Sequence, residues 1–133
     1  MNARKKYFKL HWPWIAWLAS ILILTAIPGK YVPKVQSLHD LLEFDKLVHI
    51  LLFTGLVFLA LRSFVTQYRT NSQRLLYVVI VITAIATGGV TELMQQYILG
   101  RQGSLYDFGA DALGCLIGMV LFNLMKEKII IET

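Results

Sequence analysis

Four apolar segments dominate this 133-residue chain, and each is close to the length of a membrane-spanning helix. They occupy residues 12–27, 47–65, 75–99 and 105–125. A helix needs about 20 apolar residues to cross the roughly 30 Å hydrocarbon core of a bilayer. Because lipid offers the backbone no hydrogen-bond partners, such segments must be helical. The sequence therefore predicts an all-α fold, an integral membrane bundle of four transmembrane helices.

The composition favours the same class of protein. Hydrophobic residues make up 56% of the chain and charged residues only 16%, which is more apolar surface than a soluble core of this size can bury. The single cysteine, Cys115, cannot form an intrachain disulfide, and we expect its thiol to be buried. We expect one transmembrane domain over residues 12–126, between tails at 1–11 and 127–133.

The 13 basic residues predict the orientation of the chain. With four spans, four of them (Lys30, Lys34, Lys46, Arg101) fall on one side of the membrane, and nine fall on the other: Arg4, Lys5, Lys6, Lys9, Arg62, Arg69, Arg74, Lys126 and Lys128. Cytoplasmic loops are enriched in Lys and Arg, so we expect both termini in the cytoplasm. This distribution explains the net charge of +5 without a nucleic-acid partner.

Seven ionisable residues lie within the apolar segments or at their ends. They are Asp45, Lys46, His49, Glu92, Arg101, Asp107 and Asp111. A charged side chain at mid-membrane costs roughly 2.5–3.5 kcal/mol on insertion scales, so such residues point to a functional site. In the predicted topology all seven belong to the extracytoplasmic half. We therefore expect them, with Gln95, to form one outward-facing polar pocket.

Helical spacing supports this convergence. Asp45 and His49 are four residues apart and share one helix face. The connection at residues 100–103 is short enough to make the third and fourth helices antiparallel neighbours, which brings Glu92 and Asp111 to similar depths. Two carboxylates at one depth repel each other unless a proton or a cation intervenes. The basic residues of the pocket are candidates for that cation.

Two further patterns occur on the fourth segment. Gly114 and Gly118 form a small-x-x-x-small face on which another helix can approach closely, which also suggests a homo-oligomer through these glycines. Ser104 and Asp107 have the spacing of a capping box. Capping and a role in the pocket are therefore both open for Asp107.

In combination, these residues resemble the pattern of the VanZ-like family of small bacterial membrane proteins, named after a member associated with low-level teicoplanin resistance. The resemblance covers about residues 44–118 and rests on Asp45-Lys46-Leu47-Val48-His49, Glu92-x-x-Gln95, Gly100-Arg101, Ser104, Asp107 and the run Gly114 to Gly118. It implies an envelope role at the outer face of the bacterial cytoplasmic (inner) membrane. The chain departs from the pattern at Asp111, where an asparagine is expected, so the role of this position is open.

The expected function is that of an accessory envelope factor rather than an enzyme. Its pocket would bind a lipid-linked wall precursor or a glycopeptide. Lys46, Arg101 and His49 would contact anionic groups, since cations in a partly dehydrated pocket attract phosphate and carboxylate strongly. The pocket carboxylates and Gln95 would orient these cations and accept hydrogen bonds from sugar or peptide.

Two alternatives stay open. In the first, His49, Glu92 and Asp111 are the catalytic residues of an intramembrane hydrolase or transferase, acting through a divalent metal or with Glu92 as general base. No metal-binding signature such as H-E-x-x-H is present, and we expect no metal or cofactor. In the second, the chain is a proton-coupled small transporter in which Glu92 carries the proton.

Overall fold

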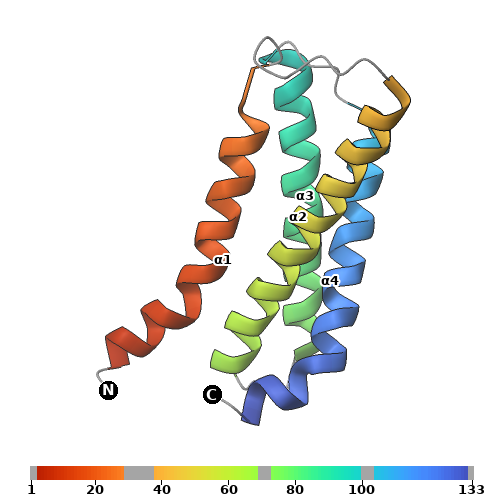
Figure 1. The fold of residues 1–133 in the computed structure, drawn as a ribbon. Coiled ribbons are helices and arrows are strands. Elements are labelled where there is room, and N and C mark those ends of the chain that lie inside the picture. Colours follow the sequence, from red (N-terminus) through yellow and green to blue (C-terminus); the bar gives the residue numbers. More distant parts are fainter. Residues whose placement is uncertain (1–2, 29–37, 69–72, 100–103, 132–133) are drawn as a thin grey trace.

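The computed structural model contains four helices that run alternately up and down (Figure 1). It describes residues 3–28, 38–68, 73–99 and 104–131. The helices are α1 (Ala3–Thr25), α2 (Leu38–Gln67), α3 (Gln73–Tyr97) and α4 (Leu105–Ile131). The all-α, four-helix architecture predicted from the sequence is confirmed.

Each helix contains a segment long and apolar enough to cross a membrane. These segments are Tyr7–Thr25, Phe44–Gln67, Gln73–Tyr97 and Leu105–Ile129. Large apolar side chains cover their outer surfaces; Ile82 is 59% exposed and Leu93 is 56% exposed. An apolar surface of this extent is suited to contact with the acyl chains of a bilayer.

The helices extend beyond the apolar segments recognised in the sequence. α1 begins within the basic tail, at Ala3, and α2 begins at Leu38, well before the apolar run at residue 47. Hydropathy marks the part of a helix suited to hydrocarbon, whereas the backbone hydrogen bonds of the helix continue into the polar flanks. The predicted segment boundaries are therefore narrower than the helices.

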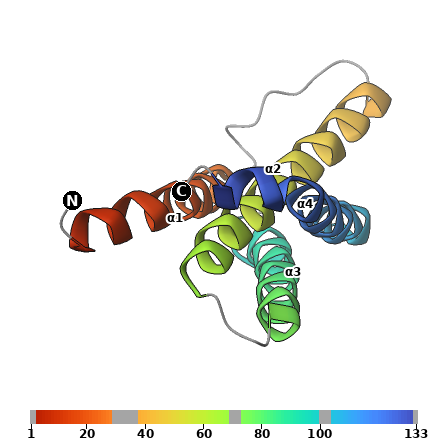
Figure 2. The same cartoon turned by 90° about the horizontal axis from the view of Figure 1, so that it is seen from below.

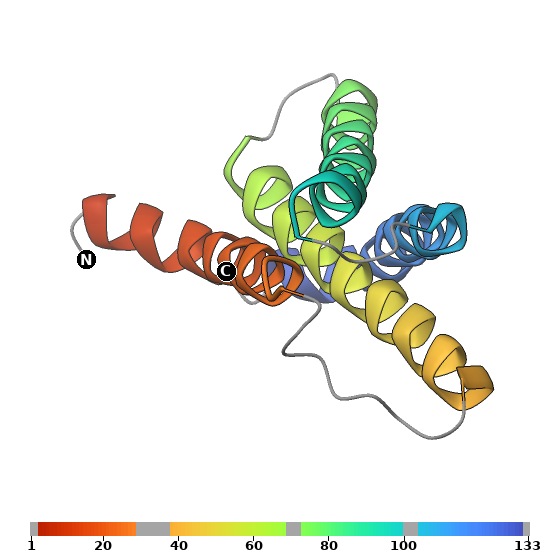
Figure 3. The same ribbon diagram turned by 90° about the horizontal axis from the view of Figure 1, so that it is seen from above.

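α2 lies between the other three helices and contacts each of them (Figures 2 and 3). Its buried residues Phe53, Val57, Leu61 and Val65 follow helical spacing along one face and form the centre of the apolar core, into which Phe122 of α4 also packs. The N-terminal half of α1 diverges from the bundle. Cys115 belongs to this core and is fully buried, as the sequence predicted.

α4 packs directly on α2 through two of its glycines, Gly114 and Gly118. A Cβ atom on Gly114 would lie 2.5 Å from the carbonyl oxygen of Ile50, and one on Gly118 would lie 2.5 Å from that of Thr54. The Thr54 hydroxyl also donates a hydrogen bond to the Gly114 carbonyl at 3.1 Å. The two helices run in the same direction (Figure 1). The predicted close helix approach is confirmed, but its partner is α2.

This packing occupies the face that was expected to form a homo-oligomer through Gly114 and Gly118. Both glycines are buried within the chain, and α2 covers them. A glycine face can accept only one helix at such a short distance. A second copy of the chain therefore cannot use this face unless α2 is displaced.

Candidate functional site

Three helices deliver buried polar side chains to the end of the bundle opposite the two chain termini (Figure 1). They are His49 from α2, Glu92 from α3 and Asp111 from α4, with exposures of 4%, 7% and 0%. We call these three residues the central cluster. Buried ionisable groups need partners, because desolvation without compensation is strongly unfavourable.

The contacts within the central cluster are short. His49 Nδ1 lies 2.8 Å from Asp111 Oδ1 and 3.9 Å from Glu92 Oε1. Because a carboxylate oxygen accepts, His49 Nδ1 donates the hydrogen bond to Asp111. Within the described residues, Glu92 Oε1 and Asp111 Oδ2 are buried without any hydrogen-bond partner. The cluster therefore has two unused acceptors directed into the protein.

Gly88 makes room for Asp111 between α3 and α4. A Cβ atom at Gly88 would lie 2.7 Å from Asp111 Oδ2. Gly88 precedes Glu92 by four residues and so lies one helical turn below it on the same face of α3. The spacing of small and polar residues noted in the sequence thus has a steric reason: only glycine leaves space for this carboxylate.

Glu92 also caps the start of α4. Its Oε2 accepts a hydrogen bond from the backbone N–H of Ser104 at 3.1 Å, while the Ser104 hydroxyl accepts one from the N–H of Tyr106 at 3.1 Å. In a capping box, the residue at the position of Asp107 would bond that first N–H. Because Glu92 takes this role, Asp107 turns towards His49 instead.

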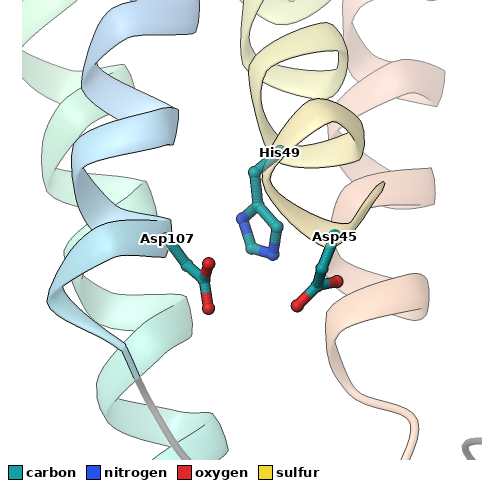
Figure 4. Close-up of side chains that lie close together, drawn as sticks. All are labelled: Asp45, His49 and Asp107. Atoms are coloured by element: carbon teal, nitrogen blue, oxygen red, sulfur yellow. The ribbon is translucent and has the colours of Figure 1, made fainter. Parts of the chain in front are cut away.

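A second group of side chains surrounds the other side of His49. Asp45 and Asp107 point towards its imidazole from α2 and α4 (Figure 4), and each of the three residues offers one ligand atom within 4.8 Å of the others. Asp107 is 8% exposed, whereas Asp45 is only partly buried. His49 is therefore shared between the central cluster and this pair of carboxylates.

The remaining predicted pocket residues have different positions. The Lys46 ammonium lies over the ring of Tyr106, 5.4 Å from its centroid, and makes no ion pair within the described part of the chain. Gln95 is buried, but its amide donates to the carbonyl of Thr25 at 3.4 Å, so it joins α3 to α1. Arg101 lies outside the described residues.

These positions give the site an excess of negative charge. Four carboxylates, those of Asp45, Glu92, Asp107 and Asp111, lie around one histidine, with Lys46 at the edge. Of the three basic residues expected in the pocket, His49 lies at its centre and Lys46 at its edge, while Arg101 lies outside the described residues. A ligand that enters the site has to supply positive charge or hydrogen-bond donors.

A small cavity of about 280 Å³ adjoins Glu92 between α3 and α4. It is lined by the apolar side chains of Leu93, Leu105 and Phe108 and by the polar residues Glu92, Gln96 and Ser104. A larger cavity, about 600 Å³, lies elsewhere between the same helices and is lined by residues such as Arg74 and Lys126, far along the chain from the cluster. Of these two cavities, the smaller one reaches the central cluster, at Glu92.

The sequence interpretation missed a polar contact at the other end of the bundle. His11 of α1 contacts the side chains of Ser63 and Gln67 of α2 and accepts a hydrogen bond from the Trp14 indole at 3.1 Å. The sequence feature that could have indicated this contact is His11 itself, a histidine between the basic tail and three tryptophans. These contacts attach α1 to α2 and are structural.

Comparison of the chain with protein-family models, with curated proteins and with solved structures finds no match in any of the three.

Proposed function

We propose that this chain is a VanZ-like accessory protein of the bacterial cytoplasmic membrane, with both termini in the cytoplasm and the central cluster on the outer side. In this proposal it binds the polar part of a lipid-linked wall precursor or a glycopeptide. The observation that carries the proposal is the convergence of His49, Glu92 and Asp111 from three helices at one end of an apolar bundle. Side chains as polar as these rarely gather in a membrane domain unless a ligand or an ion uses them.

The distribution of basic residues supports this orientation. In the described part of the chain, the helix ends on the side of the termini carry Lys9, Arg62, Arg74, Lys126 and Lys128. The positive-inside rule favours that side for the cytoplasm. The central cluster lies towards the other end of the bundle, because His49 and Asp111 are near the starts of α2 and α4 and Glu92 is near the end of α3.

The surroundings of Glu92 favour an amphipathic ligand. The cavity beside it is lined by apolar side chains, among them the exposed Leu93, and by the polar residues Glu92, Gln96 and Ser104. A lipid-linked molecule could place its chain against these walls and its sugar or peptide near Glu92. The carboxylates would accept hydrogen bonds from hydroxyl and amide groups, and Lys46 would contact a phosphate.

Binding to the purified chain tests the proposal. The protein in lipid nanodiscs would be titrated with a fluorescent polyprenyl pyrophosphate that carries the wall sugar and peptide. We expect saturable binding by the wild-type chain and at least tenfold weaker binding by Glu92→Gln. Glu127→Gln, which changes an exposed carboxylate near the other end of α4, is the matched control. Equal binding by all three proteins would refute a role of the cluster in ligand recognition.

A second candidate function is supported by the contact between His49 and Asp111. A histidine held at 2.8 Å by a buried carboxylate is the arrangement of a general base with a fixed tautomer. The corresponding activity would be hydrolysis or transfer on the same lipid-linked class of substrate. Product formation by the wild-type chain, lost in His49→Gln, would support an enzyme; binding without turnover would support the accessory role.

A further inference from the structure

We infer that the central cluster is a binding site for one divalent transition-metal ion, with His49, Glu92 and Asp111 as its protein ligands. The site uses one residue from each of α2, α3 and α4, so no contiguous metal-binding motif marks it in the sequence. This inference goes beyond the proposed function, because it does not depend on which envelope molecule, if any, the chain binds.

The distances fit a single ion. One ligand atom from each residue lies within 4.8 Å of the other two, and the His49 Nδ1 contacts measure 2.8 Å to Asp111 and 3.9 Å to Glu92. Zinc bonds to histidine nitrogen and carboxylate oxygen are about 2.0–2.2 Å long, which places neighbouring ligand atoms about 3–3.5 Å apart. The two measured contacts lie on either side of that spacing. To reach that spacing, the Glu92 carboxylate would move a few tenths of an ångström towards His49 Nδ1 and the Asp111 carboxylate a few tenths of an ångström away from it.

Burial and unused acceptors point to a missing positive charge. All three side chains are more than nine-tenths buried, and Glu92 Oε1 and Asp111 Oδ2 have no hydrogen-bond partner within the described residues. Two carboxylates and a neutral imidazole balance the charge of one divalent cation. The ion would take the place of the proton that His49 Nδ1 donates to Asp111.

The surroundings of His49 match those of a metal-bound histidine. Such a histidine almost always donates its other ring N–H to a carboxylate or carbonyl, which fixes its orientation. When Nδ1 binds the ion, Nε2 is left to donate, and Asp45 and Asp107 point towards the ring (Figure 4). This role explains why two more carboxylates lie beside a cluster that is already acidic.

The ligand set selects the class of ion. Calcium and magnesium prefer oxygen ligands alone, whereas imidazole together with carboxylates suits zinc, manganese or iron. Three protein ligands leave a coordination position for water or for a ligand group, as in catalytic zinc sites. The small cavity beside Glu92 adjoins one of the three ligand residues. A bound ion would also let an acidic site hold a phosphate.

Metal analysis of the full chain tests the inference. The protein would be purified without a polyhistidine tag, placed in nanodiscs, stripped with a chelator and titrated with Zn²⁺ or Ca²⁺. We expect about one Zn²⁺ per chain and no competition by Ca²⁺. Glu92→Gln, which keeps the side-chain shape, should weaken zinc binding at least tenfold, and the control Glu127→Gln should not change it. The double variant Asp45→Asn/Asp107→Asn should weaken it by about 10- to 100-fold.

X-ray absorption at the zinc edge identifies the ligands in the wild-type chain, so the test does not depend on any variant that fails to fold. We expect nitrogen and oxygen neighbours only. A sulfur neighbour at about 2.3 Å would assign the ion to Cys115, one turn after Asp111, and overturn the inference. A folded wild-type chain without stoichiometric zinc, or full zinc binding by Glu92→Gln, would overturn it too. The metal titration contains no lipid-linked wall precursor. A negative result would therefore overturn the metal site without bearing on the proposed binding of that precursor.

Discussion

Alanine at Gly114 tests the packing that brings His49 and Asp111 together. The added Cβ would lie 2.5 Å from the Ile50 carbonyl oxygen, whereas ordinary contacts of this kind begin at 3.4 Å. The α2 and α4 backbones would have to separate by most of the difference. Gly109 lies on the same helix and has nothing within 4 Å of its would-be Cβ, so Gly109→Ala is the matched control.

The magnitude follows from three contributions. Overpacking of a close contact typically destabilises by about 1–3 kcal/mol, and loss of the Thr54 hydrogen bond to Gly114 adds about 0.6 kcal/mol. The better helix propensity of alanine returns about 0.5–1 kcal/mol. We therefore expect Gly114→Ala to lower the free energy of unfolding by about 1–3 kcal/mol, whereas Gly109→Ala should leave it unchanged or slightly raised.

Reversible unfolding in mixed detergent micelles measures both variants on one scale. The predicted difference between them is about 2–4 kcal/mol, the sum of the packing and hydrogen-bond contributions. Equal stability of Gly114→Ala and Gly109→Ala would refute the close α2–α4 contact. It would also remove the basis for placing His49 beside Asp111.

Three further predictions concern orientation and the cluster. In a cysteine-free background, Tyr106→Cys should react with an impermeant thiol reagent in intact cells and Lys128→Cys should not; the reverse pattern would invert the proposed topology. Gly88→Ala should displace the Asp111 carboxylate, 2.7 Å from the added Cβ, and weaken zinc binding, whereas Gly89→Ala, with its nearest contact at 3.4 Å, should not; equal zinc affinities would contradict the described position of the carboxylate. Asp111→Asn should unfold within about 1 kcal/mol of wild type, because the amide oxygen still accepts the histidine hydrogen bond; a much larger loss of stability would mean that the charge itself holds the fold together.

The sequence predicted those parts of the fold that depend on length and polarity along the chain. Four apolar runs were enough to predict four helices, and the short connection at residues 100–103 was enough to predict that α3 and α4 are neighbours. The sequence also placed Glu92 and Asp111 at similar depths in the membrane, because the depth of a residue follows from the number of residues between it and the helix end. These quantities are all local to one or two adjacent segments.

Contacts between distant segments were not predictable in the same way. A glycine pattern predicts that another helix approaches closely, but it does not predict which helix. From the sequence, Gly114 could have packed against α2 or against a helix of a second chain. Gln95 has the helical spacing of Glu92, yet its amide reaches the Thr25 carbonyl because α1 happens to end there. Asp107 was ambiguous between capping and the site until the position of Glu92 on another helix settled which carboxylate bonds Ser104.

The pairing of His49 with Asp111 has a consequence for how the chain enters the membrane during synthesis. The two residues are separated by 62 positions, so α2 and α3 leave the ribosome before α4 is complete. A carboxylate at the centre of a span opposes insertion by roughly 2.5–3.5 kcal/mol, and Asp111, six residues after the start of the α4 span, carries a smaller cost of the same sign. If α2 is still beside the insertion machinery, His49 can hydrogen-bond Asp111, and the α2 backbone can pack against Gly114 and Gly118. Lipid chains offer neither contact. α2 would then help α4 to insert. The central cluster, and with it any ligand binding, would form only at this last step of synthesis.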